Sequence, residues 1–350
     1  MSMRAIATGI GSLPFTDPAQ AAEFVFRYLP EAPFWPQLPK RNVREGMVEQ
    51  YSEALPGLKV TDDGLQFDRK TAEEALEPFY ERIISMDLDH FRISPDHAAG
   101  LYAFYAALKQ RGTAGIKFIK CHVTGPFTFA AGIIDEDKAA LIHDEILMQA
   151  MVKGLAMKAL WQVKLFSEFG KPIVVFIDEP YLAGFGSAFT ALTRETAVRV
   201  LSEVSAAIKT PDCLVGVHCC GNTDWSIFTD VRTIDIINFD AFGFLDKFTL
   251  YGGEISKFLE RGGYICWGIV PTQEFRPGLT SRSLSDRIQQ GIGVLARKGA
   301  DPGLLSEQLL ISPSCGLGTL DPSSADQIFR LLKELSGHIR STPPQGGKNH

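Results

Sequence analysis

The chain has 350 residues, of which 45% are hydrophobic and 22% are charged. This length allows a core that needs no disulfides, and this composition excludes a disordered, collagen-like or coiled-coil protein. The net charge of −6 leaves no basic excess for binding nucleic acid. The longest apolar runs are only as long as strands, so we expect no membrane-spanning helix, and the first residues do not resemble a signal peptide. We therefore expect a cytoplasmic protein.

Short, continuously apolar segments recur along the chain, as is typical of strands buried on both faces. The predicted strands are residues 5–9, 91–94, 116–122, 173–177, 214–218, 236–239, 264–269 and 309–312. The predicted helices between and after them include residues 138–169, 194–209, 284–298 and 324–338. Asp321, followed by Pro322, is a favourable start for the last of these helices.

Alternation of strands and helices along the whole chain predicts parallel βα units. About eight predicted strands in a chain of this length favour a single (β/α)₈ TIM barrel over an open sheet. We predict that residues 1–340 form this one catalytic domain and that residues 341–350 are a flexible C-terminal tail. Residues 13–95, rich in Pro and Trp, fit no simple βα unit. They either contain the second strand, near residues 32–38, or form an insertion that caps the barrel.

Active sites of TIM barrels lie at the carboxyl ends of the strands. Polar or unusual residues follow most of the predicted strands, at residues 9–14, 124–128, 178–181, 218–222, 240 and 313–316. Neighbouring side chains of a strand point to opposite faces. We therefore expect Asp178 to enter the mouth of the barrel and Glu179 to be a structural partner. By the same alternation we assign the adjacent Cys121 and His122 to packing.

Six cysteines in an intracellular chain of this size do not predict a disulfide framework, but some of them are suited to bind metal. His218 and Cys220 are two residues apart at a strand end, so both side chains point to the same side. Cys315, at another strand end on the same rim, is a candidate second sulfur ligand, and Asp240 a candidate oxygen ligand. Sulfur and imidazole are good ligands for zinc. The alternative is a core histidine with cysteines as apolar filler.

Zinc held by two sulfurs and one nitrogen keeps an open position for a substrate. A thiol that coordinates there loses its proton and becomes a nucleophile at neutral pH. Hydrolytic zinc sites prefer histidine and carboxylate ligands, which favour activation of a zinc-bound water. The ligand set therefore favours alkylation of a thiol over hydrolysis.

The strand-end motifs from Ile10 to Cys315 together resemble one superfamily of TIM barrels. It comprises cobalamin-independent methionine synthase, zinc methyltransferases that act on methyl-corrinoids, and uroporphyrinogen decarboxylase. The resemblance is to the C-terminal catalytic barrel of the methionine synthases. It implies that the loop from Ile10 to Ser12 holds the carboxylate of homocysteine and that Asp178 takes its amine.

The same resemblance implies a zinc site. His218 and Cys220 match the H-x-C zinc pair, and Cys315 matches the later zinc cysteine. Asp240 stands where methionine synthases carry a glutamate ligand, but its side chain is shorter. Residues 218–222 are also similar to the H-x-C-G-N motif of corrinoid-dependent enzymes that methylate coenzyme M.

Two departures from the folate-using enzymes bear on the methyl donor. Those enzymes carry a tryptophan soon after T-G-P, where this chain has residues 129–132, and a catalytic histidine where residues 268–272 have none. Methyl-folate must be protonated at N5 before it can leave, whereas cob(I)alamin leaves without a proton. The absences favour a methyl-corrinoid, free or carried by a partner corrinoid protein, with methyl-folate as the alternative.

Other substrates and functions also fit the sequence. We expect homocysteine as the thiol substrate, with coenzyme M as the second candidate. A metal-free enzyme like uroporphyrinogen decarboxylase is disfavoured, because it would have no use for the His218, Cys220 and Cys315 set. A non-catalytic protein that binds a corrinoid or folate and passes it on also fits the motifs. We expect no nucleic-acid or membrane partner, and a homodimer is left open.

Overall fold

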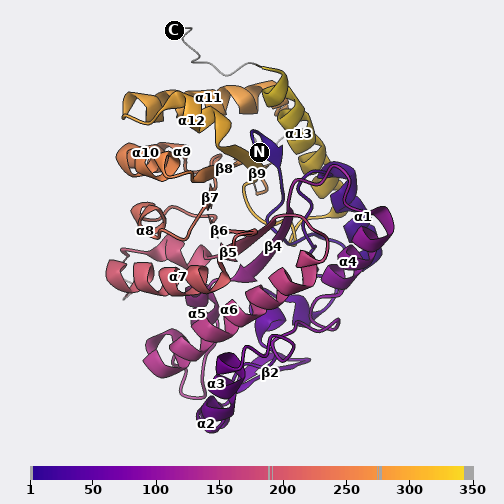
Figure 1. The fold of residues 1–350 in the computed structure, drawn as a ribbon, viewed down its shortest axis with the longest axis vertical. Coiled ribbons are helices and arrows are strands. Elements are labelled where there is room, and N and C mark those ends of the chain that lie inside the picture. The colour runs from indigo at the N-terminus through magenta and orange to yellow at the C-terminus, as the bar shows by residue number, and fades with distance from the viewer. Residues whose placement is uncertain (1–2, 188–189, 191, 274, 276–277, 343–350) are drawn as a thin grey trace.

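The structure is a computed structural model that describes residues 3–187, 190, 192–273, 275 and 278–342. Its centre is a parallel sheet of seven described strands in the order β1-β9-β8-β7-β6-β5-β4 (Figure 1). In chain order these are β1 (Ile6–Ala7), β4 (Ile119–Thr124), β5 (Ile173–Asp178), β6 (Cys213–Cys219), β7 (Ile236–Phe239), β8 (Tyr264–Val270) and β9 (Leu309–Pro313). The chain is thus a mixed α/β protein, as predicted.

Helices surround the sheet (Figure 1). They are α1 (Pro18–Tyr28), α4 (Ala99–Arg111), α5 (Pro126–Ala131), α6 (Glu145–Ser167), α7 (Arg194–Ile208), α8 (Ser226–Asp230), α9 (Leu245–Phe248), α10 (Gly252–Glu260), α11 (Ser281–Arg297), α12 (Pro302–Glu307) and α13 (Pro322–Ser341). Short 3₁₀ turns are η1 (Val43–Glu45), η2 (Glu49–Tyr51), η3 (Leu141–His143), η4 (Pro180–Gly184) and η5 (Thr249–Tyr251). Asp321 caps α13 as predicted, because its side chain accepts hydrogen bonds from the N–H groups of Ser323 and Ser324.

The predicted strand at residues 91–94 is wrong. This segment is a turn and coil before α4, although Phe91 and Ile93 are fully buried. The ring of Phe91 packs edge-on against Phe79, with centroids 5.7 Å apart. Its apolar pattern reflects burial among helices and not pairing in a sheet, a difference that periodicity over four residues cannot reveal.

Residues 33–37 stand where an eighth strand would lie, between the two edges of the sheet. On one side, Lys120 of β4 donates its N–H to the Pro33 carbonyl at 2.9 Å. On the other, Gln37 donates to the Gly11 carbonyl at 3.0 Å and accepts from the Leu13 N–H at 2.9 Å. The contacts are isolated parallel bridges and not a strand, and the prolines of the segment supply no N–H for a longer ladder. The sheet therefore curls until its edges are joined through this segment, as in a TIM barrel, but among the described residues the sheet has seven regular strands and not eight.

The next part of the chain is an insertion that packs on the outside. It contains the antiparallel hairpin of β2 (Leu58–Thr61) and β3 (Gly64–Phe67), then α2 (Arg69–Glu74) and α3 (Leu76–Ile84). Leu55 and Phe79 lie directly against Gly154 of α6. Residues 33–37 thus take the place of the predicted second strand without forming a regular one, and the predicted insertion, expected to cap the barrel, packs through Leu55 and Phe79 against α6.

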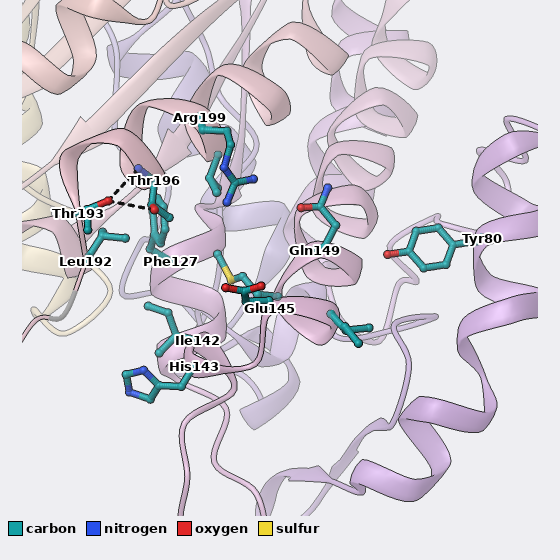
Figure 2. A pocket seen from close by; sticks show the side chains of 13 residues that line it. Tyr80, Phe127, Ile142, His143, Glu145, Gln149, Leu192, Thr193, Thr196 and Arg199 are labelled. Carbon is teal, nitrogen blue, oxygen red and sulfur yellow. Dashed lines mark hydrogen bonds between the residues drawn. The ribbon is translucent and has the colours of Figure 1, made fainter.

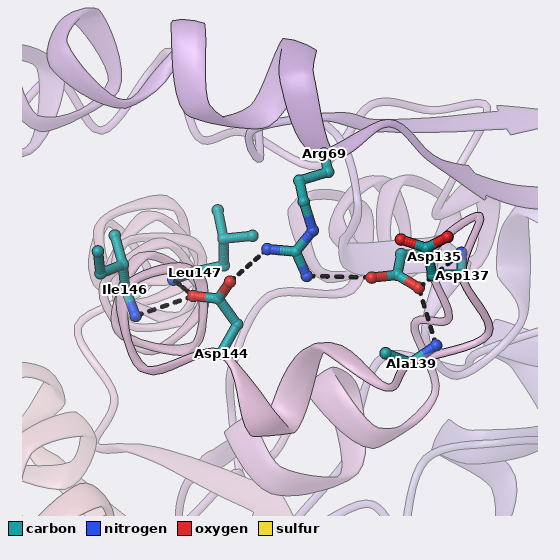
Figure 3. Close-up of polar contacts among 7 residues, drawn as sticks. All are labelled: Arg69, Asp135, Asp137, Ala139, Asp144, Ile146 and Leu147. Carbon is teal, nitrogen blue, oxygen red and sulfur yellow. Dashed lines mark hydrogen bonds and ion pairs between the residues drawn. The ribbon is translucent and has the colours of Figure 1, made fainter.

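Arg69 fastens this insertion to the chain before α6. Its guanidinium forms ion pairs with Asp135, at 3.0 Å, and with Asp144 (Figure 3). Asp144 in turn caps α6 by accepting from the N–H groups of Ile146 and Leu147 at 3.1 and 3.0 Å. One arginine therefore links the hairpin region to the start of the longest helix.

At the C-terminal end, α13 continues to Ser341, one residue past the predicted domain boundary. Residues 343–350, most of the predicted tail, lie outside the described residues. Within the described part of the chain, no helix combines the length and the apolar character needed to cross a bilayer.

Candidate functional site

A cavity of about 290 Å³, called the site cavity below, lies at the carboxyl ends of the strands. Of the seven residues predicted for the site, six line it: Ile10, Ser12, Asp178, His218, Cys220 and Cys315. They come from the ends of β1, β5, β6 and β9, which the curled sheet brings to one mouth. The structure thus brings together residues that are up to 305 positions apart in the sequence, as the strand-end rule for this architecture leads one to expect.

His218, Cys220 and Cys315 form a compact group of potential metal ligands. Their ligand atoms all lie within 4.8 Å of one another, and among the described residues this is the one such group of three or more. His218 is buried, whereas both cysteines are partly exposed toward the cavity. One imidazole and two sulfurs at this spacing fit three corners of a tetrahedral zinc site.

Asn238 of β7 fixes the orientation of His218. The amide nitrogen of Asn238 donates to the Cys266 carbonyl at 2.9 Å and to the Ser312 hydroxyl at 2.8 Å. Its amide oxygen therefore faces His218 Nδ1, at 2.5 Å, and the network assigns the proton to that nitrogen. Nε2 is then the nitrogen left for a metal, which would displace the proton that Nε2 donates to Cys220 in its absence.

The two cysteines share one negative charge. The pKa of Cys220 is lowered well below its usual range, because Cys315 and His218 hydrogen-bond to it. The pKa of Cys315 is raised, because it is the donor to that thiolate and is also buried. The group thus already holds one thiolate beside an imidazole, and a bound metal would displace the second thiol proton.

Asp240 lies outside this group. Its carboxylate accepts a hydrogen bond from the Gly243 N–H at 2.7 Å. It lines an adjoining cleft of about 580 Å³, of which Cys220 and Cys315 also form part of the wall. The structure thus does not bring the predicted fourth ligand together with the other three, because the short side chain is engaged by its own loop.

The loop from Ile10 to Ser12 is held from several sides. The ammonium of Lys120 donates to the Ile10 carbonyl, and the Ser12 hydroxyl accepts from the Gly318 N–H at 3.1 Å. Lys120 is fully buried, with its ammonium 4.4 Å from the centre of the Phe176 ring, and burial lowers its pKa to about 8. The loop is therefore rigid where a ligand would touch it.

Asp178 ends β5 beside His218 of β6 in the strand register. Its side chain is 8% exposed, and one carboxylate oxygen has no hydrogen-bond partner among the described residues. Burial raises its pKa to about 6. An unpaired buried carboxylate favours a cationic ligand, because an ammonium beside it would restore the ionised form.

Glu179 points away from the cavity, as strand alternation predicts. Its carboxylate accepts from the N–H groups of Phe127 and Thr128 at 3.0 and 2.9 Å, and burial raises its pKa to about 7. A Cβ atom on Gly125 would lie 2.1 Å from the Glu179 carboxyl carbon, so only glycine fits there. This contact fixes the segment that carries Thr124 to the rim of the site cavity.

Sequence reasoning missed two residues of the site. His122, assigned to packing, lines the site cavity. Its neighbour Cys121 belongs to the large hydrophobic core formed by strands and surrounding helices. Asn238, which orients His218, was not singled out at all. The available signal was strand alternation, since His122 precedes the rim residue Thr124 by two and Asn238 precedes Asp240 by two.

A second hollow, called the α6/α7 cleft below, is larger, with a volume of about 740 Å³. Figure 2 shows its lining, which includes Tyr80, Glu145, Gln149 and Arg199. The hydrogen bonds drawn there join only Thr193 and Thr196. None of the residues predicted for the site lies in this cleft.

No family model and no curated protein sequence matches the chain. Among solved structures, it is similar to a B12-independent methionine synthase from Shewanella sp. W3-18-1 in complex with selenomethionine, with 17% identity and a TM-score of 0.44. That match covers 68% of this chain and 65% of that chain, so this chain spans less than two thirds of the synthase. The chain is also similar to endoglucanase CEL6B from Humicola insolens (12% identity, TM-score 0.33, covering 68% and 70%) and to D-psicose 3-epimerase from Clostridium cellulolyticum H10 (14%, 0.27, 70% and 72%). With TM-scores below 0.5, none of these similarities assigns the chain to a family or an activity.

Proposed function

We propose that the protein is a zinc-dependent thiol S-methyltransferase that methylates homocysteine to methionine. The observation that carries this proposal is the group of His218, Cys220 and Cys315, whose ligand atoms lie within 4.8 Å of one another in the wall of the site cavity. Two sulfurs and an imidazole are the ligand set expected for activating a thiol, whereas hydrolytic sites prefer histidine and carboxylate.

Zinc held by these three side chains would lower the pKa of a substrate thiol, so that the thiolate is available at neutral pH. Asn238 engages Nδ1 of His218 and so leaves Nε2 as the nitrogen for the metal. Asp178 offers an unpaired carboxylate oxygen to the amine of the substrate, and the loop from Ile10 to Ser12 borders the same cavity for its carboxylate. These residues would orient the sulfur toward the methyl donor.

The adjoining cleft of about 580 Å³ suits the donor, because Cys220 and Cys315 lie in the walls of both hollows. In the reaction the new S–CH₃ bond forms as the donor–CH₃ bond breaks, the electron pair stays on the donor, and the thiol proton goes to solvent. Thiol and donor must approach the methyl carbon from opposite sides, which two hollows meeting at one wall permit. We favour a methyl-corrinoid, free or on a partner protein, over methyl-folate, since residues 268–272 contain no histidine that could protonate a folate nitrogen.

Asp178 also decides between the two acceptor thiols. Its buried carboxylate would repel the sulfonate of coenzyme M but attract the ammonium of homocysteine. Homocysteine is therefore the first substrate to test and coenzyme M the second.

The experiment that tests the proposal is a zinc measurement on protein purified without added metal, followed by methylation assays with methylcobalamin and with methyl-folate. We expect about one zinc per chain in the wild type and none in His218→Ala or Cys315→Ser. Cys219→Ser and His143→Ala are matched controls. Cys219 points away from the cavity with its sulfur on the Gly221 carbonyl, and His143 lies in the α6/α7 cleft.

Both controls should keep zinc and activity. If the wild type takes up no zinc, even when zinc is offered under reducing conditions, the proposal is wrong, and an enzyme like uroporphyrinogen decarboxylase becomes the leading alternative. If zinc is bound and methylcobalamin binds but no thiol is methylated, a carrier of corrinoids is indicated instead.

A further inference from the structure

His122 is held in the site cavity by a frame of buried side chains. The Trp35 ring stacks on its imidazole, with centroids 3.9 Å apart and planes 21° apart. Its backbone carbonyl accepts from the Tyr51 hydroxyl and from the Gln162 amide, each at 3.0 Å. The Gln162 amide oxygen accepts from the Trp35 indole N–H at 2.8 Å, which closes the frame. The position of the imidazole is therefore set before any ligand arrives.

The imidazole itself has no polar partner. His122 is 2% exposed, and neither Nδ1 nor Nε2 has a hydrogen-bond partner among the described residues. A buried polar group left unpaired is costly. A phenylalanine would fill the same space and stack on Trp35 without that cost, so packing alone does not account for a histidine here.

The surroundings indicate which part of a ligand the imidazole would meet. A Cβ atom on Gly11 would lie 3.0 Å from both Cε1 and Nε2 of His122, so this edge of the ring borders the loop from Ile10 to Ser12. The unpaired oxygen of Asp178 belongs to the same cavity. The unpaired oxygen of Asp178 can accept from the ammonium of an α-amino acid, and the unpaired imidazole of His122 can donate to its carboxylate.

The protonation state of His122 agrees with this role. Burial and the neighbouring Lys120 ammonium lower the pKa of His122 well below its usual value, so the ring is neutral. A neutral imidazole has one N–H to donate, and the Lys120 ammonium is engaged by the Ile10 carbonyl.

We infer that His122 donates a hydrogen bond to the carboxylate of the substrate and thereby selects an α-amino-acid thiol over thiols without that group. This inference rests on the proposed function, because it assumes that the site cavity takes homocysteine. It adds a specificity residue that the sequence motifs do not contain.

The test compares three ligands on the zinc-loaded protein by titration calorimetry: homocysteine, 3-aminopropane-1-thiol, which lacks the carboxylate, and 2-aminobutyrate, which lacks the thiol. The variants are His122→Phe, which keeps a ring against Trp35, and His122→Gln, which keeps an N–H donor. For His122→Phe we expect roughly tenfold to a hundredfold weaker binding of homocysteine and of 2-aminobutyrate, and unchanged binding of 3-aminopropane-1-thiol. His122→Gln should recover part of the lost affinity.

Equal losses for all three ligands would overturn the inference, because they would indicate a structural role for His122. Unchanged binding of homocysteine by His122→Phe would overturn it too, while leaving the proposed function intact. If the zinc-loaded wild type binds neither homocysteine nor 2-aminobutyrate, the proposed substrate is wrong and the inference fails with it. Zinc content should be the same in all variants.

Discussion

The α6/α7 cleft has more than twice the volume of the site cavity, about 740 against 290 Å³, yet the two differ most in the state of their polar groups. In the cleft, Glu145, His143 and Arg199 are exposed, so water can hydrate them without a ligand. In the site cavity, His122 and Asp178 are buried with unpaired atoms. By volume the α6/α7 cleft would rank above the site cavity, although it contains none of the residues predicted for the site.

The unpaired groups of the site cavity lower the stability of the folded protein. A buried carboxylate without a partner and a buried imidazole without a partner each destabilise the folded state. Buried titratable groups without partners are typical of sites that bind a ligand. Substitutions in one hollow, in the other, or in the segment between them test whether the two hollows differ in this way.

The largest effect is expected for Gly125→Ala, which disturbs the segment shared by both hollows. This segment brings Thr124 to the site cavity and Phe127 to the α6/α7 cleft. The new Cβ would lie 2.1 Å from the Glu179 carboxyl carbon and displace the carboxylate from two backbone N–H groups. We expect a loss of about 3 kcal/mol or more in the free energy of unfolding, measured in urea.

The control is Gly337→Ala on α13, where a Cβ atom would meet nothing within 4 Å. The free energy of unfolding of this variant should be higher by roughly 0.5 to 1 kcal/mol, because alanine is the better helix former. Equal stabilities of Gly125→Ala and the wild type would show that the segment between the hollows is not tightly packed.

Asp178→Asn, in contrast, should increase the free energy of unfolding of the metal-free protein. Burial raises the pKa of Asp178 to about 6, above its usual value near 4. The folded state therefore binds this proton more tightly, so the contribution of Asp178 to stability is fully present below about pH 4 and is lost as the pH rises through about 6. Asn carries no charge to bury, and at about pH 8 the variant should be more stable by up to about 3 kcal/mol.

Denaturation curves at about pH 4 and pH 8 test this expectation, since the gain should vanish at the lower pH. Glu145→Gln in the α6/α7 cleft is the comparison, and it should lose up to about 1 kcal/mol, because Glu145 lies in the first turn of α6. A gain for Asp178→Asn that is the same at both pH values would contradict the explanation by ionisation. The variant should also bind homocysteine more weakly, as expected when stability and function oppose each other.

The two halves of the chain differed in how far the sequence could predict them. The predicted strands at residues 173–177, 236–239, 264–269 and 309–312 overlap β5, β7, β8 and β9. These strands are buried on both faces, so their apolar runs are continuous. Residues 33–37 join the sheet only through isolated bridges beside prolines, and residues 91–94 are apolar for another reason, so local pattern failed in both places.

The site shows the same division. His218, Cys220 and Cys315 could be placed together because strand ends meet at one mouth. The frame around His122 could not be predicted. Its members Trp35, Tyr51 and Gln162 come from an irregular segment, a 3₁₀ turn and a long helix. Contacts of this kind depend on tertiary packing and leave no periodic signal in the sequence.

The smallest effect is expected for Asn238→Ala, which acts on the metal site only through His218. Without the amide oxygen at 2.5 Å, the imidazole is free to turn and to change tautomer. Zinc should still bind, but roughly tenfold to a hundredfold more weakly, as is typical for the loss of a partner behind a ligating histidine. Competition with a chromogenic chelator measures this affinity directly.

Gln149→Ala in the α6/α7 cleft is the matched control, because it also removes a primary amide but touches no ligand. It should leave zinc affinity unchanged. Asn238 also donates to the Cys266 carbonyl and the Ser312 hydroxyl, so a general loss of stability could lower zinc uptake as well. Asn238→Asp separates the two effects, because its carboxylate can still accept from His218 Nδ1 but no longer donates to those groups. If the affinity recovers in Asn238→Asp while the stability does not, the hydrogen bond to His218 is what holds the ligand. If neither recovers, Asn238 contributes to the stability of the sheet and not to the orientation of His218.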